Sequence, residues 1–305
     1  MSQIDLSVNI GNLTLKNPIL LASGTVGYGF EIANFVDFDK LGGIVTKSVS
    51  LKPRKGNKPQ RILETTAGML NAIGLANVGI EEFITEKIPF LETLNTAVIC
   101  NVAAGTVEEY FECVKILTEQ PSIKAFEINI SCPNVKEGGL IFGNDVKYAG
   151  IITEKVRSAT DKPIILKLSP NTANISDFAK IAKDNGADAV SAINTLVGAA
   201  FDIYSRKPKL NNITGGLSGP AIKPVAIAKV FEISRKVDIP IIGIGGICDY
   251  KDVIEFMIAG ATAIQLGTIN FINPFATNEI FNDLIKYCET NSISKINTLT
   301  ASYII

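Results

Sequence analysis

The chain has 305 residues, with 29 basic and 30 acidic side chains and a net charge of −1. This balance gives no electrostatic basis for binding nucleic acid or an anionic membrane, and it favours a small-molecule ligand. The absence of histidine excludes Ser-His and Cys-His nucleophile pairs and histidine metal sites, so any proton transfer must fall to Cys, Lys, Asp, Glu or Tyr.

Eight short apolar runs rich in β-branched residues recur along the chain, at residues 18–22, 43–46, 97–101, 125–129, 163–168, 189–194, 240–245 and 263–267. Helical periodicity is found at residues 106–118, 146–159, 176–185, 222–236 and 250–259. Apolar strands that alternate with amphipathic helices are typical of a parallel sheet covered by helices. Eight strands predict a single-domain (β/α)8 TIM barrel over residues 1–305. A doubly wound open sheet is the alternative, but its Gly-x-Gly-x-x-Gly fingerprint is missing.

The spacing between the second and third runs is irregular, because residues 50–75 are too many for a simple loop. We expect a hairpin excursion and an ordered loop here, and such additions to barrels tend to be functional. Residues 256–278 hold no charged side chain and are long enough to span a bilayer. Glycine, amide and proline residues interrupt this segment, which favours a buried helix end, strand and turn.

The five cysteines are widely spread and include no Cys-x-x-Cys pair: Cys100, Cys113, Cys132, Cys248 and Cys288. Their number and spacing argue against a disulfide framework, a zinc site or an iron–sulfur cluster in this chain, and fit a reducing cytoplasm. The first ten residues carry Asp5 and lack a basic region followed by an apolar run, so we expect no signal peptide. Four of the cysteines are expected to be structural, and Cys132 is considered below.

Polar residues stand repeatedly where the predicted strands end, which is where barrel active sites are built. They are Ser23, Lys47, Asn101, Asn129, Lys167, Asn194, Thr195, Gly245, Gly246, Gly267 and Thr268. Together they predict a pocket for a large, polar, planar ligand. The glycines of the last two strands, with Gly215, Gly216 and Gly219 in the preceding loop, favour a phosphate site of bare backbone N–H groups. Lys47 and Lys167 suit a ligand that gains negative charge, although a Schiff-base lyase remains possible on these residues alone.

Nine motifs occur in order: LASGTVGYG (21–29), TKSVSLKPRKGN (46–57), MLNAIGLAN (69–77), INISCPNVKEGG (128–139), LKLSPN (166–171), INT (193–195), GGLSGPAIKP (215–224), GIGGI (243–247) and QLGT (265–268). They resemble the flavin-dependent dihydroorotate dehydrogenases, specifically the cytosolic form that works with a separate iron–sulfur flavoprotein subunit. The resemblance runs nearly end to end, and only the last fifteen or so residues match nothing diagnostic.

The resemblance implies FMN in the barrel mouth, one per chain, at positions Ser23, Lys47, Ser48, Asn101, Asn129, Lys167, Ile193, Gly219, Gly245, Gly246, Gly267 and Thr268. It places the substrate at Lys47, Asn71, Ala72, Ile73, Gly74, Leu75, Asn129, Asn194 and Thr195. Cys132 takes the catalytic base position, with Lys47 as a second catalytic residue. An ordinary thiol has a pKa near 8.5, so a nearby lysine and amide donors would be needed to supply thiolate at neutral pH.

The implied reaction oxidises (S)-dihydroorotate to orotate in pyrimidine biosynthesis, with a hydride passing to FMN and a proton to Cys132. FAD and a 2Fe–2S cluster are expected only on a partner subunit that reduces NAD, around a homodimer core in a heterotetramer. Some family members use serine as the base and have an N-terminal membrane helix, and Cys132 places this chain outside that group. The alternatives are a fumarate-linked stand-alone enzyme, a dihydropyrimidine dehydrogenase-like enzyme and a non-catalytic flavin-binding or phosphate-binding subunit.

Overall fold

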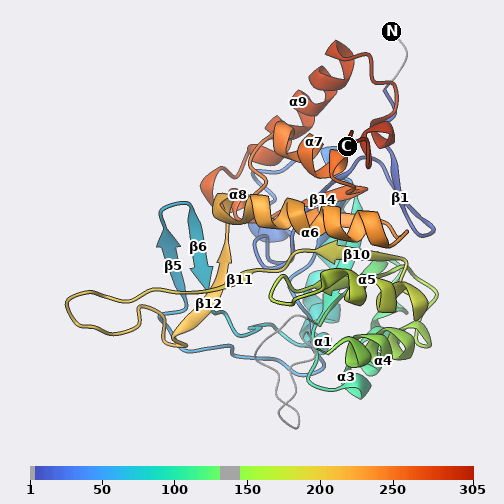
Figure 1. The fold of residues 1–305 in the computed structure, drawn as a ribbon. Coiled ribbons are helices and arrows are strands. Elements are labelled where there is room, and N and C mark those ends of the chain that lie inside the picture. Colours follow the sequence, from blue (N-terminus) through green and yellow to red (C-terminus); the bar gives the residue numbers. More distant parts are fainter. Residues whose placement is uncertain (1–3, 131–144) are drawn as a thin grey trace.

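The computed structural model describes residues 4–130 and 145–305, and its centre is a closed barrel of eight parallel strands (Figure 1). In barrel order the strands are β3 (Ile19–Leu21), β4 (Gly43–Val45), β7 (Ala97–Val102), β8 (Ile123–Asn129), β9 (Ile164–Leu168), β10 (Ala189–Ala192), β13 (Ile241–Ile244) and β14 (Ala263–Leu266). Nearly all of their residues are buried, as expected for strands with side chains in the barrel interior on one face and under helices on the other. The predicted barrel is confirmed, and each of the eight apolar runs supplies one strand.

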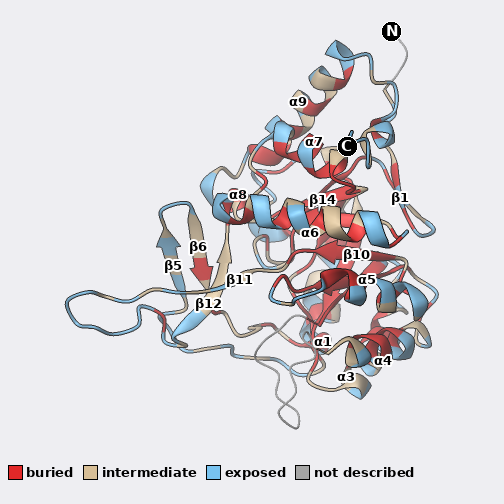
Figure 2. Cartoon of the chain, in the orientation of Figure 1, coloured by how far each residue is buried: buried red, intermediate tan, exposed pale blue. Residues whose placement is uncertain are grey.

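Helices surround the barrel, and their buried faces are turned toward it (Figure 2). The longer ones are α3 (Val107–Leu117), α4 (Val146–Arg157), α5 (Ile175–Asp184), α6 (Lys223–Lys236), α7 (Tyr250–Ile258) and α9 (Ala276–Thr290). The short ones are α1 (Ile80–Glu82), α2 (Ile88–Leu91) and α8 (Ile269–Ile272). In α5, for example, Ile175, Phe178, Ala179 and Ala182 are buried, which is the spacing of one helical face. Each predicted helix therefore agrees with an observed one to within a few residues.

Side-chain caps fix where several of these helices begin. Thr106 Oγ1 accepts a hydrogen bond from the backbone N–H of Glu109 at the start of α3. Asp249 and Asp252 form a reciprocal capping box at the start of α7, a few residues after the glycines that follow β13. These caps satisfy backbone donors that have no partner within the helix, and so define the loops at the carboxyl ends of the strands.

A second, antiparallel sheet stands beside the barrel mouth, in the order β11-β12-β6-β5 (Figure 1). Its strands are β5 (Ile62–Thr65), β6 (Gly68–Asn71), β11 (Leu196–Ala199) and β12 (Thr214–Ser218). The hairpin β5–β6 confirms the excursion predicted after the second barrel strand. The sequence did not predict that this hairpin would pair with β12, and Gly215 and Gly216 are therefore strand residues rather than loop residues.

The remaining hairpin, β1 (Val8–Ile10) and β2 (Leu13–Leu15), packs Ile10 and Leu15 into the main core. The uncharged segment 256–278 forms the end of α7, strand β14, α8 and the start of α9. Among residues 4–130 and 145–305, no helix combines the length and the apolar character needed to cross a membrane.

Candidate functional site

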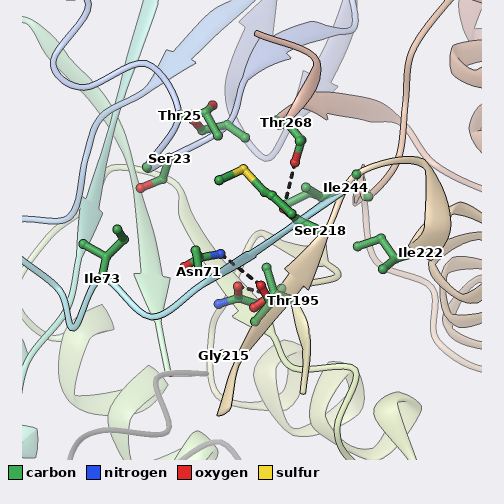
Figure 3. A pocket seen from close by; sticks show the side chains of 18 of the residues that line it. Ser23, Thr25, Asn71, Ile73, Thr195, Gly215, Ser218, Ile222, Ile244 and Thr268 are labelled. Carbon is green, nitrogen blue, oxygen red and sulfur yellow. Dashed lines mark hydrogen bonds between the residues drawn. The ribbon is translucent and has the colours of Figure 1, made fainter. Parts of the chain in front are cut away.

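A cavity of about 660 Å³ lies at the carboxyl ends of the barrel strands, bounded on one side by the small antiparallel sheet. Ser23 and Ile73 lie on one side of it, and Ile222 and Ile244 lie on the other (Figure 3). The volume is within the range of small-molecule and cofactor sites. The cavity is therefore large enough for a cofactor and a small substrate side by side.

Most residues predicted for the site line this cavity. They are Ser23, Lys47, Ser48, Asn71, Ala72, Ile73, Gly74, Leu75, Asn129, Lys167, Ile193, Asn194, Thr195, Gly219, Gly245, Gly246, Gly267 and Thr268. Asn101 does not line it, because its fully buried side chain lies behind Ser48, whose Oγ donates to Asn101 Oδ1 at 2.5 Å. Cys132 lies outside the described residues, so its assignment as the base stays a prediction.

The end of β8 brings Asn129 to the pocket. Its main-chain carbonyl accepts a hydrogen bond from the hydroxyl of Tyr110 in α3 at 2.7 Å, and both residues are buried. Its side-chain Oδ1 is 3.5 Å from Asn194 Nδ2, at the limit of a hydrogen bond. Two amides from β8 and from the segment after β10 thus lie together, each able to donate and accept hydrogen bonds.

The small sheet forms the wall opposite the barrel strands. Asn71 Nδ2 donates to the carbonyl of Gly216 at 3.2 Å, which ties β6 to β12. Thr268 Oγ1 donates to Ser218 Oγ at 2.8 Å and ties the end of β14 to the same sheet (Figure 3). A side chain at Gly216 would collide with Thr195 Oγ1, so a glycine here lets Thr195 pack against the wall.

The glycines that follow β13 and β12 meet in a close-packed corner. Gly245 and Gly246 have φ of +130° and +75°, and Gly219 has φ of +95°, all in the region that favours glycine. A Cβ on Gly246 would lie 2.9 Å from the carbonyl oxygen of Gly219, and one on Gly219 would lie 2.6 Å from Gly68 Cα. These contacts require glycine for packing, and the three glycines also line the cavity without side chains, so their backbone can approach a phosphate group.

Glu127 is the functional candidate that the sequence analysis missed. It lies in β8 two residues before Asn129, and its carboxylate is fully buried below the pocket. Lys167 Nζ donates to its Oε1 at 3.2 Å, and Asn101 Nδ2 donates to the same oxygen at 2.7 Å. Burial alone would raise the pKa of the Glu127 carboxyl, but the Lys167 ammonium and the neutral donors hold it below its ordinary value. A charge within the apolar run AFEINI was the signal that could have identified it.

Several other lining residues were not predicted: Arg61, Met69, Ser169, Asn171, Ser218 and Cys248. Asn171 supports the pocket wall, because its Nδ2 donates to the Thr195 carbonyl at 3.0 Å and its Oδ1 accepts from Val197 N–H at 3.0 Å. Cys248 was expected to be structural, and it instead reaches the pocket. Burial raises the pKa of its thiol, so it is protonated at neutral pH.

Comparison with known proteins gives a consistent set of relatives. A family model described as dihydroorotate dehydrogenase matches residues 5–287. The "Dihydroorotate dehydrogenase B (NAD(+)), catalytic subunit" of Pelobacter propionicus is 52% identical over 298 residues, covering 98% of each chain. The protein of the same name from Geotalea uraniireducens is 50% identical over 304 residues, covering all of both chains.

Solved structures share the fold, and one example is a dihydroorotate dehydrogenase. The crystal structure of DHODH from Eimeria tenella, in complex with ferulenol, has a TM-score of 0.80 and is 20% identical in sequence. The match covers 98% of this chain and 88% of that one. At this identity the likeness supports the barrel architecture alone.

Proposed function

The chain belongs to the dihydroorotate dehydrogenase family, and from that premise we propose that it is the FMN-containing catalytic subunit of an NAD-linked enzyme. Its reaction is the oxidation of (S)-dihydroorotate to orotate in pyrimidine biosynthesis. One observation carries the proposal: a single cavity gathers all the residues assigned to flavin and substrate, except Asn101 and the undescribed Cys132. Such convergence from many separate segments is not expected of unrelated polar residues.

The residues present fit FMN. Gly219, Gly245 and Gly246 suit its phosphate, because they line the cavity without side chains, so that their backbone can approach phosphate oxygens. Thr268 adds a hydroxyl at the same end of the pocket. Lys167 is the penultimate residue of β9 and lines the cavity, where its charge would favour an electron-rich flavin ring.

The chain's own residues would transfer the proton, stabilise the developing charge and orient the substrate. When bound, FMN supplies the acceptor for the hydride that leaves C6 of dihydroorotate. Cys132 would take the C5 proton, which is acidified by the adjacent carbonyl, and Lys47 would stabilise the negative charge that develops there. Asn71, Asn129 and Asn194 would orient the substrate, because amides match both the urea-like edge and the carboxylate of a pyrimidine acid.

The electrons then leave through a second protein. We assign FAD and a 2Fe–2S cluster to a partner subunit that reduces NAD, with a homodimer of this chain at the core of a cytoplasmic heterotetramer. The names of the relatives support a separate subunit, since they are called NAD(+) catalytic subunits. Exposed apolar side chains also favour protein contacts. They gather on and between β11 and β12: Val197, Phe201, Ile203, Tyr204 and Ile213.

The test is spectroscopic. Purified protein should be yellow, release FMN on denaturation, and bleach when dihydroorotate is added without oxygen. Dihydrouracil is the matched control, because it lacks the carboxylate and should bleach the flavin far more slowly. A colourless protein that cannot be reconstituted with FMN would contradict the proposal. If fumarate reoxidises the bleached flavin, and no copurified partner gives NAD-linked activity, the stand-alone type is favoured.

A further inference from the structure

Below the pocket, Glu127 is held by hydrogen-bond donors from four barrel strands. Oε1 accepts from Lys167 Nζ of β9 and Asn101 Nδ2 of β7, as described above. Oε2 accepts from Gln265 Nε2 of β14 at 2.7 Å and from Ser191 Oγ of β10 at 2.9 Å. A buried carboxylate is expected to have several hydrogen bonds, and these four hold all four partner side chains in place.

The contacts also define the charge of the group. Lys167 Nζ, Asn101 Nδ2 and Gln265 Nε2 can only donate, so three of the four contacts require an acceptor on Glu127. The Asn101 amide is oriented by Ser48, whose hydroxyl donates to its Oδ1, which turns Nδ2 toward Glu127. Glu127 is therefore ionised at neutral pH and forms a buried ion pair with Lys167, whose side chain is only 7% exposed.

We propose that Glu127 is a positioning residue for the redox step. It holds the Lys167 ammonium in place below the pocket, and its negative charge balances that of Lys167. The two side chains together are called the pocket floor, and their net charge is zero. This inference rests on the proposed function, because it assumes that FMN binds in this pocket. Lys167 touches the cofactor in that assignment, and Glu127 acts through it. The neighbouring strand β10 brings no charged group to Lys167, whereas β8 brings Glu127.

The physical consequence concerns the reduction potential of bound FMN. Reduced FMN at neutral pH carries one negative charge more than the oxidised form on its ring. A net positive floor would therefore favour the reduced form, and a net negative floor would oppose it, with little screening by solvent at this depth. The neutral pair leaves FMN able both to accept a hydride and to pass its electrons on.

Four proteins test this at neutral pH: the wild type, Glu127→Gln, Lys167→Gln and the double variant. Their floors carry local charges of zero, plus one, minus one and zero. We expect the midpoint potential of FMN to be highest in Glu127→Gln, lowest in Lys167→Gln, and close to wild type in the double variant. Each single change should alter the preference for reduced over oxidised FMN at least tenfold, which is about 30 mV for a two-electron couple.

The surrounding side chains can accommodate glutamine at position 127. Gln265 Oε1 is buried and has no hydrogen-bond partner among residues 4–130 and 145–305, so the Gln265 amide can turn and accept from the new amide group. If Glu127→Gln still fails to fold, the double variant must show a higher potential than Lys167→Gln. Glu232→Gln is the control, because Glu232 accepts from Ser176 and pairs with Lys229 and Lys236 on the outer helices. It should keep the wild-type potential.

The outcomes separate the two proposals. A Glu127→Gln protein that binds FMN with the wild-type potential would overturn the role of Glu127, as would equal potentials in Lys167→Gln and the double variant. The wild type would in that case still bind FMN and bleach with dihydroorotate. A wild type that binds no FMN would contradict the proposed function itself.

Discussion

The hydroxyl of Tyr110 donates a hydrogen bond to the main-chain carbonyl of Asn129 at 2.7 Å. The bond joins helix α3 to the last residue of strand β8, three residues before Cys132 in the sequence. It therefore anchors the residue that presents an amide to the pocket and begins the segment carrying the proposed base.

Tyr110→Phe removes this donor and leaves a buried carbonyl with one contact fewer. We expect the free energy of unfolding to fall by about 1–3 kcal/mol, measured by urea denaturation. Flavin reduction by dihydroorotate should slow as well, because Asn129 is less firmly placed. Tyr204→Phe is the control, since Tyr204 is 89% exposed, and it should change neither quantity. Equal stability of the two variants would contradict the anchoring role.

Cys132→Ala removes the proposed base and leaves every residue assigned to flavin and substrate unchanged. Loss of a general base typically slows a reaction by about 10²–10⁴-fold. We expect a yellow protein whose flavin is reduced by dihydroorotate more slowly by a factor in that range, in anaerobic stopped-flow measurements. Cys248→Ala is the matched control, because it removes a thiol that lines the cavity and is assigned no proton transfer. An unchanged rate in Cys132→Ala would show that another group takes the proton.

Gly246→Ala tests the proposed phosphate corner. Its φ of +75° strains any other residue, and a Cβ would lie 2.9 Å from the Gly219 carbonyl oxygen. We expect a loss of about 1–3 kcal/mol in stability, with FMN affinity reduced at least about tenfold in a fluorescence titration. Gly11→Ala is equally strained, with φ of +58° and a Cβ 2.8 Å from Asp188 Cβ, but it lies in the β1–β2 turn. It should lose stability and keep its FMN affinity.

Low pH should lower the free energy of unfolding, because it protonates Glu127. The pKa of this carboxyl is held below its ordinary value of 4.5, so near that pH the folded chain binds fewer protons than the unfolded chain. The stabilisation is complete above pH 4.5 and is lost as the pH falls through the lowered pKa. Glu127→Gln should be less stable than the wild type by about 3–5 kcal/mol at neutral pH, because it leaves Lys167 unpaired. In urea titrations this difference should shrink below pH 4.5, and a constant difference would refute the account.

The sequence was sufficient for the barrel and for most of the pocket. Runs such as residues 163–168 are apolar throughout, because a barrel strand is buried on both faces, and that pattern is local. Lys47 and Lys167 were identified because a charged residue that ends such a run lies at the mouth of the barrel. The family motifs then supplied roles that no spacing argument could give, including that of Cys132.

The pairing of β6 with β12, the position of Asn101 behind Ser48 and the four contacts of Glu127 depended on tertiary structure alone. The four residues that bind Glu127 lie 26 to 138 positions from it in the chain, and nothing local indicates that they approach it. Continuous apolar runs identify the strands, and helical periodicity identifies the buried face of each helix. The closure of the barrel decides which buried polar groups satisfy one another, since a buried charge is stable only where several strands bring donors to it.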